Sequence, residues 1–105
     1  MKAKDHATLN AFSRRIRQYF PEARIWAFGS RVREDGSQHS DLDVCIVLNL
    51  LDEKADAKIM EIAWEIGFEN DLVISTVTFS REEFEKGPCS QSMLVKNILD
   101  HGIAA

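Results

Sequence analysis

Cysteine, proline and long apolar runs are all scarce in this chain. The two cysteines lie in unlike contexts, Cys45 inside an apolar stretch and Cys89 just after Gly87-Pro88, so we expect no disulfide. No apolar stretch approaches the roughly 20 residues of a membrane span. The N-terminal residues lead into no signal-peptide apolar region. These absences predict a cytoplasmic protein with no membrane-spanning segment.

Positive charge is not in excess either. The chain has 13 Lys and Arg against 17 Asp and Glu, which gives a formal net charge of −4. Such a surface repels a nucleic-acid backbone, which argues against a polynucleotide substrate. It is compatible with a nucleotide delivered as its Mg²⁺ complex, because the metal cancels charge on both sides. The length of 105 residues and the 45% apolar content predict a single globular domain over 1–105.

The spacing of apolar residues predicts alternating helices and short strands. Leu9, Phe12 and Ile16 recur at three- and four-residue steps, as on one face of a helix. Short β-branched and aromatic runs bounded by glycine or polar residues indicate strands. We expect helices over 5–20, 52–67 and 93–102, strands over 24–28, 42–48 and 71–79, and a short helical turn after Ser80. This order predicts an α/β fold with a small mixed β-sheet flanked by helices.

The loop between the first two expected strands is longer than most connections in a small domain, and such loops are often functional. It begins at Gly29-Ser30, where glycine permits a sharp turn and where N–H groups and the serine hydroxyl can hold phosphate oxygens. Arg31 or Arg33 can add a charge-assisted contact, although both also suit solvated loop charges. We therefore expect an anion-binding turn at the start of this loop.

Two acids end the same loop. Asp41 and Asp43 are two residues apart at the entry to a strand, so their side chains point to one face. Carboxylates so close repel unless a cation holds both ionised. No cysteine or histidine ligand lies nearby in the sequence except the lone His39, which we expect to be an exposed loop residue. Carboxylate oxygens alone indicate a hard ion such as Mg²⁺ or Mn²⁺. Asp71 opens the third expected strand and completes three carboxylates if that strand neighbours the second; its role is then to activate an attacking hydroxyl.

The run from Phe28 to Asp43 resembles the signature of the minimal nucleotidyltransferases, within the DNA polymerase beta superfamily. The pattern is Gly-Ser, then a polar loop, then Ser-Asp-x-Asp on a strand, and a looser likeness extends through the third strand and beyond. The resemblance implies metal ligands and catalytic carboxylates at Asp41, Asp43 and Asp71, and nucleotide-binding residues at Gly29, Ser30, Arg31 and Ser40. One departure is Glu34, which stands where the family commonly carries glycine and puts an acid on the phosphate side of the loop.

The resemblance also implies a reaction and a partner. The reaction is transfer of a nucleoside monophosphate, AMP where ATP is the donor nucleoside triphosphate, to an acceptor hydroxyl with release of pyrophosphate. Members are often paired with a small helical protein of the HEPN type, a toxin that the nucleotidyltransferase modifies and silences. We expect no acceptor domain within these 105 residues and therefore expect the acceptor on such a partner.

Two alternatives stay open from the sequence. The first is a non-catalytic antitoxin or binding module that keeps the fold and covers its partner's surface. The second is a two-component modifier of the aminoglycoside type, whose acceptor pocket comes from another subunit. Apolar surface left exposed by so small a domain can be covered by a homodimer or by a helical partner.

Overall fold

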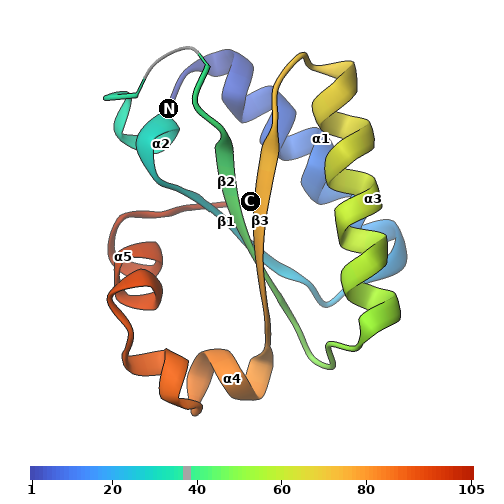
Figure 1. The fold of residues 1–105 in the computed structure, drawn as a ribbon, viewed down its shortest axis with the longest axis vertical. Helices are drawn as coiled ribbons and strands as arrows, with labels where there is room; N and C mark the ends of the chain where they lie inside the picture. Colours follow the sequence, from blue (N-terminus) through green and yellow to red (C-terminus); the bar gives the residue numbers. More distant parts are fainter. Residues whose placement is uncertain (37–38) are drawn as a thin grey trace.

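A computed structural model, which describes residues 1–36 and 39–105, shows a four-stranded mixed sheet with helices on both faces (Figure 1). The helices are α1 (Ala3–Tyr19), α2 (Ser30–Arg33), α3 (Glu53–Glu69), α4 (Arg81–Glu85), a 3₁₀ turn η1 (Pro88–Gln91) and α5 (Met93–His101); the strands are β1 (Arg24–Phe28), β2 (Leu42–Leu48), β3 (Ile74–Ser80) and β4 (Ile103–Ala104). The sheet order is β3-β2-β1-β4. Since β2 runs parallel to β3 and β1 runs antiparallel to both its neighbours, the expected α/β fold is confirmed.

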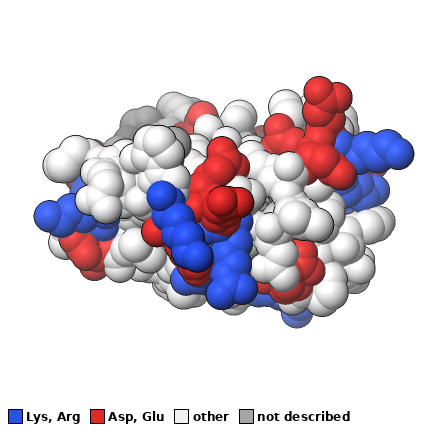
Figure 2. Space-filling model, turned by 90° about the horizontal axis from the view of Figure 1, so that it is seen from below, with Lys and Arg blue, Asp and Glu red and all other residues white. Residues whose placement is uncertain are grey.

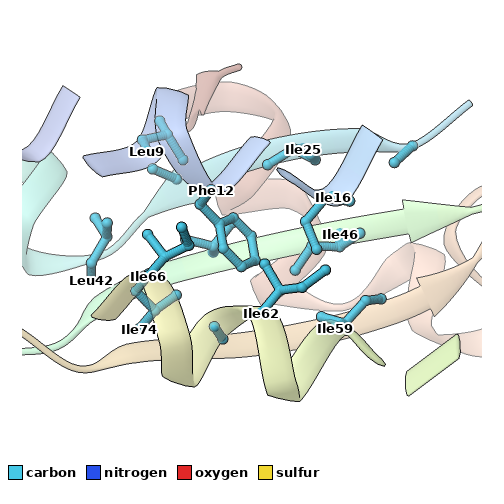
Figure 3. Packing of buried hydrophobic residues seen from close by; sticks show 14 of the residues in the cluster. Leu9, Phe12, Ile16, Ile25, Leu42, Ile46, Ile59, Ile62, Ile66 and Ile74 are labelled. Carbon is cyan, nitrogen blue, oxygen red and sulfur yellow. The ribbon is translucent and has the colours of Figure 1, made fainter. Parts of the chain in front are cut away.

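The main core lies between one face of the sheet and the helices α1 and α3. The expected helical stripe of α1 is buried, and Phe12 extends from it toward α3 above β2 (Figure 3). Asp52 caps α3 as expected, since its carboxylate accepts a 2.8 Å hydrogen bond from the Ala55 N–H. Leu42, Val44, Ile46 and Leu48 of β2 line the sheet side of this core.

A second, smaller core covers the opposite face of β2. Cys45 and Val47 point to this side and pack with Phe79, Phe84 and residues of α5. Burial raises the pKa of the Cys45 thiol to about 12, so the thiol stays protonated at neutral pH, as expected for a core residue. Because both faces of β2 are buried, its sequence is a continuous apolar run rather than an alternating one.

The turn between α3 and β3 differs from the expectation. The strand expected from Asp71 begins at Ile74, and the helix expected to stop at Gly67 continues to Glu69. Asp71 itself has a left-handed backbone with φ 57°. The Leu72 N–H then donates to the Gly67 carbonyl at 3.0 Å, and a Cβ on Gly67 would lie only 2.6 Å from the Leu72 carbonyl oxygen. Gly67 therefore does not end α3. It leaves room for the following turn to pack against the helix.

The remaining elements follow the sequence closely. Ser80 and Glu83 form the capping box of α4, with hydrogen bonds of 3.1 and 3.0 Å between each side chain and the other's N–H. The two-residue strand β4 was not expected, because a pair of residues carries no alternation pattern. At the lower end of the molecule, acidic and basic side chains lie side by side (Figure 2). Within the described part of the chain, no helix is long and apolar enough to cross a membrane.

Candidate functional site

The backbone of Gly29 lies directly against the carboxylate of Asp43. The antiparallel register of β1 and β2 pairs Phe28 with Asp43, which puts this acid beside the end of β1. Gly29 has φ 84° and ψ −158°, a conformation that side chains other than hydrogen strongly disfavour. A Cβ at this position would overlap Asp43 Oδ2. Glycine is therefore required twice here, for its backbone angle and for the space that the carboxylate occupies.

Asp41 and Asp43 influence one another electrostatically. Partial burial and the negative charge of Asp41 raise the pKa of Asp43, while the positive charge of Arg33 opposes this effect. The two acids are thus close enough to repel, as expected from their spacing. Oxygen donors under mutual repulsion suit a hard divalent cation, and Mg²⁺ commonly takes only one or two carboxylates and completes its shell with water and phosphate oxygens. The residues present therefore fit such a metal.

Two serines meet at Gly36 in the loop that joins α2 to β2. A Cβ on Gly36 would lie 2.7 Å from Ser30 Oγ and 2.9 Å from Ser40 Oγ, so the loop backbone passes close to both hydroxyls. Ser30 opens α2, whose first turn is closed by hydrogen bonds to the Gly29 carbonyl. The residues expected to hold phosphate from the two ends of the loop are thus gathered in one place. Ser37 and Gln38 between them lie outside the described residues.

Glu34 occupies a backbone position that favours glycine. Its φ of 60° and ψ of 29° are left-handed, and it forms the C-cap of α2. Glycine populates this region without the steric penalty of a Cβ. The departure from the family pattern at this position is therefore a matter of backbone conformation as well as charge. Its carboxylate is exposed.

Arg31 braces the loop from inside. Its Nη1 forms a 3.0 Å ion pair with Asp5 of α1, and its Nε donates a 2.7 Å hydrogen bond to the Ser40 carbonyl. The side chain of Asp5 is only 4% exposed and that of Arg31 14%. The structure ties its guanidinium to α1 and to the residue before Asp41, and the phosphate contact implied for Arg31 stays a prediction. Arg31 thereby links α1 to the backbone of the residue before Asp41.

Replacing Arg31 with Met is expected to lower the free energy of unfolding by about 3 kcal/mol, because it leaves the buried Asp5 carboxylate without its cation. Urea denaturation measures this loss. The matched control is Arg15→Met, which breaks the half-exposed Arg15–Glu65 pair and should cost about 1 kcal/mol or less. Adding Asp5→Asn to the Arg31 variant should recover part of the loss. Equal costs for the two arginine variants would contradict the bracing role.

The third carboxylate expected beside Asp43 is not found on β3. Ser75 occupies the neighbouring strand position, and Asp71 lies before the strand. The parallel register pairs Asp43 with Ser75, so the β3 side chain next to Asp43 on its face of the sheet is a hydroxyl. Asp71 lies before the strand, in the turn after α3, and lines two hollows together with Ser40. Among the described residues, no three acidic, cysteine or histidine side chains gather closely enough to hold a metal. The structure thus brings two of the three expected acids together.

The fold agrees with comparisons to known proteins. A model of the nucleotidyltransferase domain family matches residues 9–105. The chain belongs to this family. Two mutant crystal structures of the toxin–antitoxin pair MntA-HpeT share the fold of this nucleotidyltransferase domain. One aligns with a TM-score of 0.59 and 22% sequence identity, covering 91% of this chain and 69% of the other. The second aligns with a TM-score of 0.62 and 18% sequence identity, covering 90% of this chain and 69% of the other. No curated protein matches the chain.

The nucleotidyltransferase domain has hollows that reach both parts of its site. A cleft of about 920 Å³ between α3, β3 and the loop reaches Ser40 and Asp41. A second of about 380 Å³ reaches Gly29 and is walled by Phe28, Val32, Arg33, Asn97 and His101. One opening therefore leads to Asp41 and another to the glycine turn that lies beside Asp43.

Sequence reasoning missed several residues of this arrangement. Asp5 carried a signal, because an acid four residues before Leu9 falls on the apolar stripe of α1 and needs a buried cation. The resemblance names Arg31 and not Arg33 as a site residue, yet the charge of Arg33 acts on Asp43. Ser75 carried no signal, since its place beside Asp43 depends on the strand register.

Proposed function

We propose that this domain transfers a nucleoside monophosphate from a Mg²⁺-bound nucleoside triphosphate to a hydroxyl group on a partner protein. The observation that carries the proposal is the contact between the Gly29 turn and Asp43, with Asp41 close beside. An anion-binding turn and a metal-binding carboxylate pair thereby share one small volume. The two hollows that reach them suit a reaction with two substrates.

The roles follow from this placement. Asp41 and Asp43 would hold Mg²⁺ or Mn²⁺, and the backbone at Gly29 with the hydroxyls of Ser30 and Ser40 would hold phosphate oxygens. The metal, when bound, neutralises phosphate charge and favours departure of pyrophosphate. Arg31 positions the loop that carries these groups.

The chemistry is an in-line displacement at the α-phosphorus. The acceptor oxygen forms a bond to phosphorus, the bond from phosphorus to the β-phosphate bridging oxygen breaks, and pyrophosphate leaves with that electron pair. The proton of the hydroxyl passes to a carboxylate in the large cleft, for which Asp71 is our proposed acceptor. The Gly29–Ser30 turn holds the departing phosphates in place.

The proposed acceptor is a small helical protein of the HEPN type, with ATP as the donor. Support comes from the sequence signature and from the structural likeness to the toxin–antitoxin pair MntA-HpeT. The observation that favours the second candidate, a non-catalytic antitoxin, is the pairing of Asp43 with Ser75 rather than with an acid. A domain that lacks a third carboxylate beside its two metal-binding acids can still bind its partner protein after losing nucleotidyl transfer.

Calorimetric titration with ATP and Mg²⁺ is expected to give saturable binding that disappears when EDTA removes the metal. Metal dependence is expected because the carboxylate pair repels a bare triphosphate. Transfer is then followed with the partner protein and ATP labelled at either the α- or the γ-phosphorus.

Label on the partner from α-labelled ATP alone indicates nucleotidyl transfer, whereas label from γ-labelled ATP indicates phosphorylation and contradicts the proposal. Metal-dependent binding without any transfer would favour the non-catalytic antitoxin. If ATP binds equally well in the presence of EDTA, the carboxylate pair does not take part in nucleotide binding through a metal.

A further inference from the structure

The outer side of α3 presents large apolar side chains to solvent. Met60, Trp64 and Phe68 are 61%, 70% and 76% exposed and follow one another at four-residue steps, so they form one line along the helix, the α3 stripe. The rings of Trp64 and Phe68 stack with centroids 5.5 Å apart and planes 13° apart. Val73 in the following turn adds a fourth exposed apolar side chain, at 62%. Contiguous apolar surface of this kind marks an interaction site.

The α3 stripe is one wall of the cleft that reaches Asp41. The cleft of about 920 Å³ is lined by Met60, Trp64 and Phe68 on the helix side and by Val73 and the first half of β3 on the other. Arg31, His39, Ser40, Asp41 and Asp71 line the same cleft. A partner seated on the stripe therefore lies in the same hollow as Asp41.

The charges around the stripe select the kind of partner. From residue 60 to residue 71 every charged side chain is acidic: Glu61, Glu65, Glu69 and Asp71. Two of these acids contact cations of the chain itself, through the Lys58–Glu61 and Arg15–Glu65 surface pairs. Glu69 and Asp71 make no ion pair among the described residues, so a second copy related by twofold symmetry would set these acids against each other, which disfavours a homodimer at this surface. A partner with basic flanks is complementary.

The four-residue spacing of the α3 stripe indicates the shape of its partner. Side chains at four-residue steps form a ridge that packs into the groove of another helix. The ring stack holds two members of this ridge in a fixed arrangement, which reduces the entropy lost on binding. A helix with an apolar stripe and lysine or arginine on its flanks matches both the ridge and the rim.

We propose that the α3 stripe docks a basic amphipathic helix of the acceptor protein and so presents the acceptor hydroxyl to Asp41 through the shared cleft. This inference rests on the proposed transfer function for its biological meaning. Docking itself is a binding event, however, and can be measured without any transfer.

The probe is a pair of synthetic helical peptides of about 18 residues, long enough to form an isolated helix, with the same leucine stripe and either lysine or glutamate on the flanks. Fluorescence anisotropy of the labelled peptide is expected to show the lysine peptide binding about tenfold more tightly than the glutamate peptide, a preference that salt reduces. Trp64→Ser with Phe68→Ser should weaken the lysine peptide by about tenfold or more. Leu50→Ser and Met93→Ser, at side chains 87% and 81% exposed elsewhere, should change nothing.

Several outcomes would overturn the docking proposal: no binding of either peptide, equal binding of both, or equal loss in the Leu50 and Met93 variants. Analytical ultracentrifugation provides a further check, because a dimer that the Trp64 and Phe68 substitutions dissociate would identify the occupant as a second copy. Titration of the doubly substituted protein with Mg²⁺ and ATP should match the unsubstituted protein. That titration separates failure of docking from failure of the nucleotide site.

Discussion

Asp43→Asn is expected to lower nucleotidyl transfer by about a thousandfold, the rate equivalent of the several kcal/mol of charge stabilisation that a bound metal supplies. The substitution keeps the shape of the side chain against Gly29 but removes the negative charge that would hold the cation. Binding of Mn²⁺, followed by electron paramagnetic resonance of the free ion, should weaken in parallel. This second measurement reports on the metal without requiring a known acceptor.

The fold of the Asp43→Asn variant should be unaffected or more stable at neutral pH without metal. Burial and the charge of Asp41 raise the pKa of Asp43, which means that folding disfavours its charged form. Removing that charge also removes the attraction to Arg33, but burial and Asp41 outweigh this attraction, so the net effect on folding is not a loss. The matched control is Asp100→Asn, an exposed acid on α5, which should retain both Mn²⁺ binding and transfer. Full metal affinity in the Asp43 variant would refute the assigned role.

The parts of the site that are close in sequence were predictable. Gly29-Ser30 and the Asp41–Asp43 spacing are local patterns, and strand periodicity alone puts the two acids on one face. The contact between Gly29 and Asp43 was expected only as proximity, because the β1–β2 register that creates it joins residues far apart in the sequence. The fold divides in the same way. The individual helices and strands could be predicted from local patterns, whereas the strand order β3-β2-β1-β4 depends on packing between distant segments.

The parts that sequence reasoning missed depend on long-range contacts or on backbone angles. Asp71 was expected to begin a strand, but its left-handed φ of 57° belongs to a turn that Gly67 makes room for. The ion pair of Asp5 with Arg31 joins α1 to the loop across 26 positions, and no local pattern names that partner. The α3 stripe was not expected from the sequence, although a second apolar line on a helix that already has a buried one is a signal for an interface.

Gly29→Ala is expected to destabilise the protein by about 2 kcal/mol or more and to abolish metal-dependent nucleotide binding. The backbone at φ 84° and ψ −158° costs a residue with a Cβ about 1–3 kcal/mol. The added methyl group would also overlap Asp43 Oδ2, so the carboxylate must move away from its place beside the turn. Urea denaturation measures the first effect and calorimetry with Mg²⁺ and ATP the second.

A double-mutant cycle separates the two costs of that methyl group. In an Asp43→Ala background the overlap is gone and only the backbone strain is left, so Gly29→Ala should cost less stability there than in the original protein. Gly87→Ala is the matched control, because a Cβ at Gly87 would lie 3.0 Å from the Glu83 Cα, away from the site. It should lower stability and leave nucleotide binding intact. If Gly29→Ala costs the same in both backgrounds, the turn and the carboxylate are not in contact, and the shared volume on which the proposed chemistry rests does not exist.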